Sequence, residues 1–207
     1  MTNSVLNQPL VLLLAGWCSG ISVYLTAALL GICGHAGWIE LPGQMQALTN
    51  PLIIAVAVIL FLIEFVADKV PYVDSAWDSV HTFIRPLGAA GLGMLAGVDQ
   101  GPVAQTLFAL LTGTLALNTH AVKASARLAI NTSPEPFSNI AASFGENALV
   151  FFLFWFFVKH PILAGALIVL LVVLSFLFLR MMWGFVRKLF RRSESPPHVG
   201  TPAGRTS

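Results

Sequence analysis

The stretch EFVADKVPYVDSAWDSVHTFIRP, residues 64–86, decides the fold of this chain. It carries four acids, two bases and one histidine: Glu64, Asp68, Asp74, Asp78, Lys69, Arg85 and His81. The stretch begins where the apolar run LIIAVAVILFLI (52–63) ends. An unpaired charge at membrane depth costs on the order of a few kcal/mol, so such a concentration of charge is normally paired or functional. We therefore predict a polar site at the end of a membrane helix.

The composition places the chain among polytopic membrane proteins. Of its 207 residues, 57% are hydrophobic and only 10% are charged, which lies outside the range of soluble domains. The net charge of +2 gives no support to a nucleic-acid partner. We expect one all-α membrane domain over residues 1–186, with the lipid bilayer as its surroundings.

About six transmembrane helices are predicted from the apolar runs, because roughly 20 apolar residues span a bilayer as a helix. Pro51 suits the first turn of the second span, and Pro71 ends that span. Residues 187–207 begin basic and continue rich in Pro, Ser and Gly, which is typical of a disordered cytoplasmic tail. The expected spans are about 9–34, 50–70, 86–98, 102–131, 140–159 and 161–185.

A short amphipathic helix is predicted between the second and third spans, over about residues 72–85. Asp74, Asp78, His81 and Arg85 follow one another at intervals of four, three and four, so they share one face of a helix. A segment this polar does not span a bilayer alone. We expect it to lie in the interface or to enter the membrane as a re-entrant element.

A second polar stripe lies on the fourth span. His120, Lys123 and Arg127 follow at helical spacing, and Glu146 lies on the next span. Between them, Ser133 before Pro134 and Glu135 resembles a helix start, which would expose backbone N–H groups.

Charge asymmetry gives an orientation. With six spans and the basic tail in the cytoplasm, the N-terminus is also cytoplasmic. Lys69, Arg85, Lys123 and Arg127 then fall on the cytoplasmic side, so residues 64–86 and 120–146 can meet. We expect Lys123 and Arg127 to pair with carboxylates from 64–78.

The preferred function is a small transporter or channel-like protein for an ion, a small anion or a phosphate-bearing lipid. Helices broken at Pro71 and Pro134 would direct their N-termini and basic side chains at a cavity, and histidines there would carry protons near neutral pH. The candidate substrate or ion site comprises Glu64, Asp68, Lys69, Asp74, Asp78, His81, Arg85, His120, Lys123, Arg127, Glu135, Ser138, Asn139 and Glu146.

Two alternatives stay open. The charges can pair simply to hold a structural scaffold together. Alternatively, Asp74, Asp78 and His81 offer oxygen and nitrogen ligands for a divalent metal in a membrane-embedded enzyme, although Arg85 one turn on would repel a cation. The sequence has no nucleophile elbow, phosphate-binding glycine loop or H-E-x-x-H motif. We therefore expect no cofactor other than a divalent metal.

The stretch 64–86, together with NTSPEPFSN at 131–139, resembles the small bacterial membrane proteins grouped as domain-of-unknown-function family 4126. The likeness covers about residues 16–185 and implies an integral protein of the bacterial inner membrane with no established activity. The resemblance favours part of the candidate set and assigns no role to any member: Glu64, Asp68, Lys69, Asp74, Asp78, His81, Arg85, Pro134, Glu135, Ser138 and Asn139. The chain departs from the family at Ser22, where a basic residue is common, and at Asn147, where an acid is common.

Three glycines recur every four residues at Gly93, Gly97 and Gly101. Small residues at this spacing let two helices approach closely. They suit burial within the bundle or the seam of a homo-oligomer.

Overall fold

The computed structural model describes residues 4–70, 73–131 and 136–193, and all regular structure within these ranges is helical. The prediction of an all-α chain is confirmed. The described elements are α1 (Ser4–Ile21), α2 (Val23–His35), η1 (Gly43–Thr49), α3 (Pro51–Ala67), α4 (Val73–Ala96), η2 (Val98–Gln100), α5 (Pro102–Asn131), α6 (Pro136–Lys159) and α7 (Pro161–Ser193).

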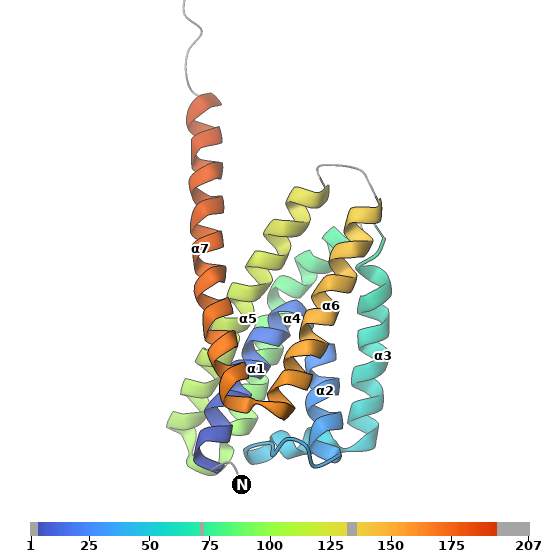
Figure 1. Ribbon diagram of the computed structural model, residues 1–207, viewed down its shortest axis with the longest axis vertical. Coiled ribbons are helices and arrows are strands. Elements are labelled where there is room, and N and C mark those ends of the chain that lie inside the picture. The colour runs from blue at the N-terminus through green and yellow to red at the C-terminus, as the bar shows by residue number, and fades with distance from the viewer. Residues whose placement is uncertain (1–3, 71–72, 132–135, 194–207) are drawn as a thin grey trace, which may run out of the picture.

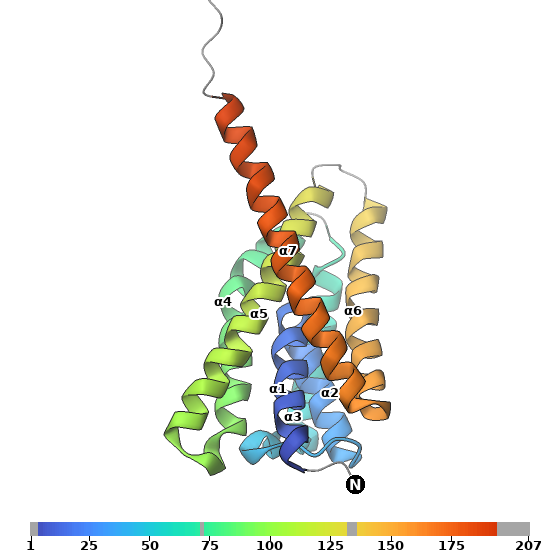
Figure 2. The same cartoon turned by 60° about the vertical axis from the view of Figure 1, so that its left-hand side comes forward.

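The first apolar segment is a hairpin of two helices, whereas the sequence predicts one helix over 9–34. Ser22 breaks it with an extended backbone (φ −151°, ψ 109°), and its side chain accepts a hydrogen bond from the Leu25 N–H as the N-cap of α2. The N-terminus and η1 lie at the same end of the bundle (Figures 1 and 2). The chain therefore enters the bundle along α1, turns at Ser22 and returns along α2. Apolar content alone could not reveal this break, because a capping serine fits inside an apolar run.

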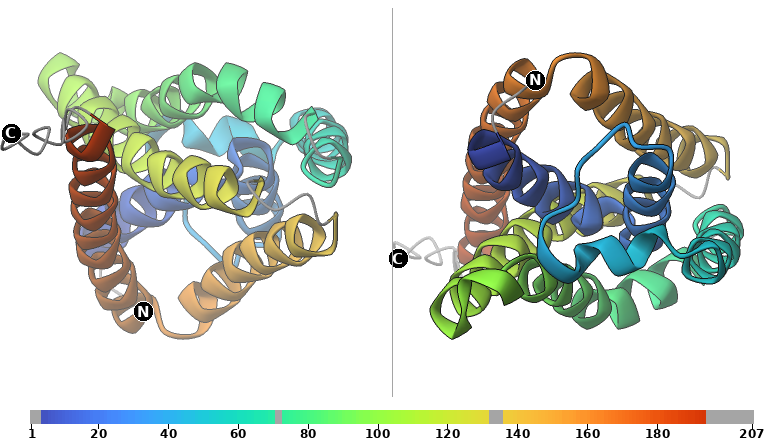
Figure 3. Two further views of the ribbon diagram at one scale, coloured as in Figure 1. Left: turned by 90° about the horizontal axis from the view of Figure 1, so that it is seen from above. Right: turned by 90° about the horizontal axis from the view of Figure 1, so that it is seen from below.

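This α1–α2 hairpin lies in the interior of the bundle (Figure 3). Almost every side chain from Val11 to Val23 is buried, and Leu14 and Cys18 have no exposed surface. A helix that is apolar on all sides is suited to such a central position.

Helices α3 to α7 run up and down around the hairpin (Figure 1). They expose large apolar side chains, such as Leu52 and Ile59 on α3 and Leu170 and Leu177 on α7, each more than half exposed. Apolar surface of this extent marks a site of contact with a membrane or with another protein. In the described part of the chain, Phe137–Lys159 and Pro161–Gly184 are long and apolar enough to cross a membrane, and η1 with α3 form a third candidate bent by 75°.

The structure corrects the boundary expected near Pro86. Residues 73–85 do not form a separate amphipathic helix, because α4 continues through Pro86 to Ala96. Proline removes one backbone hydrogen bond from a helix, and here packing against α5 holds the helix together. A Cβ atom at Gly97 would lie 2.6 Å from the Gln105 backbone nitrogen, and one at Gly93 would lie 2.5 Å from Thr112 Oγ1. Gly93 on α4 and Gly97 directly after α4 therefore both allow a close approach to α5 within one chain.

The described ends of the chain lie at opposite ends of the bundle (Figure 1), whereas the sequence predicts both termini on one side. The hairpin accounts for this difference, since α1 and α2 together return the chain to the end where it begins. The expected helix start at Ser133, Pro134 and Glu135 lies outside the described residues. The tail from residue 194 also lies outside the described residues. The basic residues before it belong to α7, which continues to Ser193.

Candidate functional site

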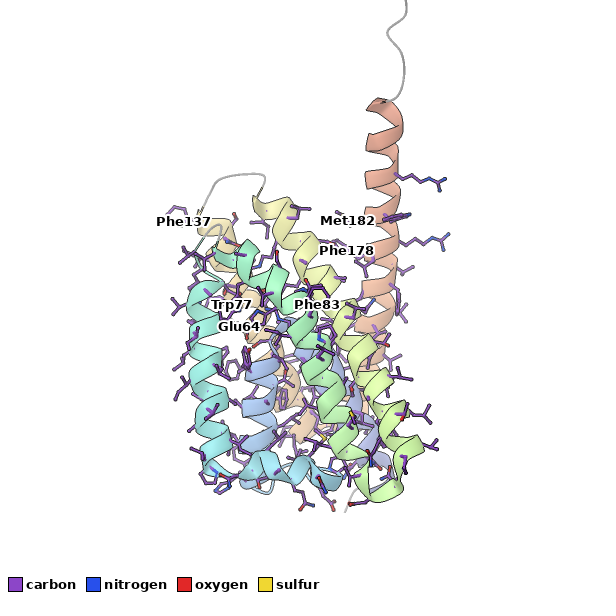
Figure 4. The ribbon with its side chains drawn as sticks, turned by 180° about the vertical axis from the view of Figure 1, so that it is seen from behind. Glu64, Trp77, Phe83, Phe137, Phe178 and Met182 are labelled. Carbon is purple, nitrogen blue, oxygen red and sulfur yellow. The ribbon has the colours of Figure 1, made fainter. Side chains whose placement is uncertain are left out.

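Charged side chains from four helices meet inside the bundle beside the hairpin tip. We call this set the ion network; it comprises Glu64, Asp68, Asp74, Asp78, Arg85, Lys123, Arg127 and Glu146. The Glu146 side chain is 19% exposed, and the other seven residues are buried. Figure 4 shows Glu64 pointing into the bundle, whereas Phe83 and Phe137 lie on its outer surface. Helical spacing places the members on inward faces of α3, α4, α5 and α6.

Arg85 is the most deeply buried cation of the network. Its Nη2 atom lies 2.8 Å from Glu64 Oε1, and its Nη1 atom lies 2.9 Å from Asp78 Oδ1. The second oxygen of Glu64 accepts a hydrogen bond from Ser22 Oγ. The Glu64 carboxylate therefore sits between a guanidinium and the N-terminus of α2, where the helix dipole favours negative charge.

His120 extends this arrangement as a hydrogen-bond chain. Arg85 Nη1 donates to His120 Nδ1 at 2.7 Å. Because arginine has no acceptor, His120 Nδ1 must carry the lone pair, and the ring proton is assigned to Nε2. Nε2 then donates to Thr82 Oγ1 at 3.0 Å, and Thr82 donates to the Asp78 carbonyl at 2.9 Å. This series of hydrogen bonds holds His120 in its neutral form at the centre of the ion network.

Lys123 lies among oxygen atoms. Its Nζ atom is 2.8 Å from Asp68 Oδ2, 3.4 Å from Glu146 Oε2 and 3.9 Å from Asp78 Oδ1. It also donates to the Ile21 carbonyl at 3.4 Å. The predicted pairing of Lys123 with carboxylates from 64–78 is confirmed.

Arg127 connects the end of α5 to the start of α6. Its Nη2 and Nε atoms donate to the two oxygens of Glu146 at 2.7 and 3.1 Å, a bidentate geometry that only arginine provides. Nη1 donates to the Asn139 carbonyl at 3.0 Å and to the Asn139 side-chain oxygen. Asp74 Oδ1 lies 3.9 Å from Arg127 Nη1, so this predicted pair is also present.

The described ion network holds more acid than base. Its five carboxylates surround three cations, an excess of two negative charges when all are ionised. In the described ranges, Asp68 Oδ1 and Asp78 Oδ2 are buried and accept no hydrogen bond. A buried carboxylate oxygen without a partner is costly. The network therefore has capacity for a proton or a cation.

Three predicted residues are placed differently. His81 stacks on Trp77 at 4.6 Å and donates from Nδ1 to the Trp77 carbonyl at 2.8 Å. Lys69 lies over the Phe65 ring and donates to the Phe65 carbonyl; burial lowers its pKa, which the Asp68 carboxylate opposes. Ser138 is half-buried in the first turn of α6. Glu135 lies outside the described residues.

Two residues of the predicted metal set have other partners in the structure. Asp74, Asp78 and His81 share a helix face, yet Asp78 pairs with Arg85 and His81 turns to a backbone carbonyl. Among the residues that the structure describes, no three His, Cys, Asp or Glu side chains are placed to hold a metal ion. Helical spacing alone could not show that these side chains have other partners.

Residues 10–181 match the model of the family described as "domain of unknown function (DUF4126)". The chain belongs to this family. No match was found among curated proteins or solved structures. The DUF4126 match includes the whole ion network and the hairpin tip, so the site described above lies within the family domain.

Three contributors to the site in this DUF4126 chain were not predicted from its sequence. Ser22 entered only as a departure from the family, although a serine within an apolar run is a candidate helix cap. Thr82 was not considered, although it lies four residues after Asp78 on the same helix. The third missed contributor, the Ile21 carbonyl, has no signal in side-chain chemistry.

Proposed function

We propose that this DUF4126 protein is a small membrane transporter that binds and moves protons or small cations through the ion network. The observation that carries the proposal is the excess of buried carboxylates with unpartnered oxygens. Such groups are stabilised by taking up a proton or a cation. Of the substrates expected from the sequence, a small anion or a lipid phosphate is disfavoured, because a net negative site repels it.

The architecture supports an intramembrane site. We propose that α3 to α7 each cross the membrane and that α1 and α2 form a re-entrant hairpin. Helices α4 and α5 have 24 and 30 residues, roughly 36 and 45 Å at 1.5 Å per residue, which suffices to span. Their charges face inward and pair there, as intramembrane charges do. Irregular backbone beside a buried ion site is typical of transporters.

The proposed orientation follows from basic residues. Arg180 and Arg187 on α7 lie toward the end of the bundle where Lys69 and Arg127 also lie, and the positive-inside bias places that end in the cytoplasm. Five crossings then put the N-terminus on the opposite side. The bacterial inner membrane, expected from the family resemblance, is the proposed location.

The test is ion movement in reconstituted vesicles. Purified protein in phosphatidylethanolamine–phosphatidylglycerol vesicles with an acidic interior and a pH dye should release internal protons when NaCl or KCl is added outside. Choline chloride, which has no small cation, should not trigger release. Asp78→Asn should abolish the response, whereas Asp99→Asn, remote from the ion network in η2, should leave it unchanged.

A structural scaffold is the competing function, favoured by the number of ion pairs in the ion network. It predicts that Asp78→Asn lowers thermal stability and that wild-type vesicles respond like protein-free vesicles. That outcome, with wild-type protein shown to be folded by circular dichroism, would reject transport.

A further inference from the structure

An apolar groove of about 540 Å³ lies between α2 and α6, toward the end of the bundle where the N-terminus lies (Figure 1). Its size and its apolar and aromatic lining are typical of a ligand site. Its walls are formed by two side chains of α2 and four of α6: Leu29, Cys33, Phe151, Phe154, Trp155 and Val158. The four residues of α6 follow at helical spacing and form one face of that helix. The groove therefore runs along α6 for roughly 10 Å, at 1.5 Å per residue.

One end of the groove reaches the membrane–water interface in the membrane placement proposed above. The apolar stretch of α6 that is long enough to cross a bilayer, Phe137–Lys159, ends at Lys159, and Lys159 lines the groove together with Trp38. Trp38 and Trp155 are 64% and 58% exposed, and tryptophan is enriched at that interface. A lipid can therefore place an acyl chain in the groove while its headgroup stays beside Lys159.

A second cavity of about 250 Å³ adjoins the groove at this end. It shares Trp38, Val158 and Lys159 with the groove and adds Asn7 and Glu40. Lys159 and Glu40 are both exposed, and within the described residues neither of them forms an ion pair. The second cavity therefore presents one positive and one negative group, each without a partner of opposite charge.

We propose that the groove and the second cavity together bind one zwitterionic phospholipid whose headgroup ends in a primary ammonium, as in phosphatidylethanolamine. Its phosphate matches Lys159 in charge and its ammonium matches Glu40, to which it can donate a charge-assisted hydrogen bond. A choline headgroup has no N–H to donate to Glu40, and an anionic headgroup places its net negative charge near that carboxylate. The apolar groove takes one acyl chain. This site lies at the opposite end of the bundle from the ion network and is independent of ion movement.

The test is native mass spectrometry of the full-length protein, delipidated in detergent and then mixed with the dioleoyl form of phosphatidylethanolamine, phosphatidylcholine or phosphatidylglycerol. The Kd of the first bound lipid should be about fivefold lower for phosphatidylethanolamine than for the other two, which is the effect of one exposed charge pair. Glycerophosphoethanolamine has the same headgroup but no acyl chain, so it should not compete at equal concentration. Competition by this compound would overturn the role of the groove.

Two variants test the headgroup contacts separately. Glu40→Gln should remove the preference for phosphatidylethanolamine over phosphatidylcholine and leave the binding of phosphatidylcholine unchanged. Lys159→Gln should weaken the binding of all three lipids by about fivefold, because each carries a phosphate. Asp99→Asn and Arg180→Gln change exposed charges outside both cavities. These two controls should alter neither the Kd nor the preference.

A third variant places the lipid in the groove. Leu29→Trp adds bulk to the groove wall and should reduce the binding of phosphatidylethanolamine, whereas Leu170→Trp on the exposed face of α7 should not. Circular dichroism shows whether each variant is folded. If Leu29→Trp does not fold, the comparison of dioleoyl phosphatidylethanolamine with glycerophosphoethanolamine tests the groove in the wild-type protein.

Equal binding of the three lipids by the wild-type protein would show non-specific annular lipid only and would overturn the proposal. A preference for phosphatidylethanolamine that persists in Glu40→Gln would also overturn it, as would tighter binding of phosphatidylglycerol than of phosphatidylethanolamine. These results are distinguishable from those of the vesicle experiment. Vesicles that move no ions would reject transport and leave the lipid site standing, because the lipid measurement does not involve the ion network.

Discussion

Both ends of the bundle have buried side chains, but apolar packing stabilises one end and ion pairs stabilise the other. Toward the N-terminal end, α1, α2, α6 and α7 pack side chains such as Leu14, Leu153 and Ile168, all with no exposed surface. Toward the other end lies the ion network, whose Arg85 is also fully buried. The apolar end depends on many weak, non-directional contacts. The ionic end depends on a few directional bonds, and loss of one partner leaves a buried charge. Equal burial therefore does not mean equal tolerance of substitution.

The largest expected effect comes from removing the central cation. Arg85→Met keeps much of the side-chain volume but leaves Glu64 and Asp78 without their partner. It should cost about 3–5 kcal/mol, which corresponds to a fall in Tm of about 10 °C. Thermal unfolding followed by circular dichroism measures the change. Arg180→Met on the exposed face of α7 is the control and should change the Tm little. A small effect at both positions would mean that the two carboxylates are protonated and need no cation.

The contact between the hairpin tip and α5 gives the next effect. A Cβ atom at Gly20 would lie 2.6 Å from Thr119 Cβ and 2.9 Å from the His120 nitrogen. Gly20→Ala should therefore destabilise the protein by about 1–3 kcal/mol through overpacking. Gly91→Ala, where no atom lies within 4 Å, should instead stabilise the helix by about 0.4–1 kcal/mol. Equal Tm values for the two variants would contradict the close packing of the tip.

The cap at the hairpin tip should contribute less. Ser22→Ala removes both the N-cap of α2 and the hydrogen bond to Glu64, at a cost of about 0.5–2 kcal/mol. Ser22→Thr keeps the hydroxyl and should retain most of the stability. Comparing the Tm values of the two variants tests whether the hydroxyl matters. If threonine is as harmful as alanine, the site is limited by side-chain size instead.

The smallest effect is expected for a conservative exchange at the apolar end. Leu14→Met preserves volume and should cost less than about 1.5 kcal/mol. The equivalent exchange at the ionic end, Arg85→Lys, should cost more, because an ammonium cannot hold Glu64 and Asp78 with the two-pronged geometry of a guanidinium. Measured side by side, these variants test the comparison directly. Equal Tm changes would show that the ionic end is as adaptable as the apolar core.

Part of the site could be predicted from spacing alone. Intervals of four, three and four from Asp74 to Arg85 fixed one polar face, because a helix repeats every 3.6 residues. The similar spacing from His120 to Arg127 predicted a second polar face on α5. Both polar faces are present in the structure. The prediction of a separate amphipathic helix was wrong because Pro86 usually ends a helix, whereas packing of α4 on α5 carries the helix through it.

The sequence by itself determined an all-helical chain, the inward polar stripes and the acid-rich character of the site, since these depend on composition and local periodicity. Only the tertiary structure decided which charges pair, that Lys123 lies in a cage of oxygens and that the first apolar run folds back at Ser22. The reason is physical. Helical periodicity acts over a few residues, whereas the pairing of Arg85 with Glu64 and of Lys123 with Asp68 depends on how separate helices pack.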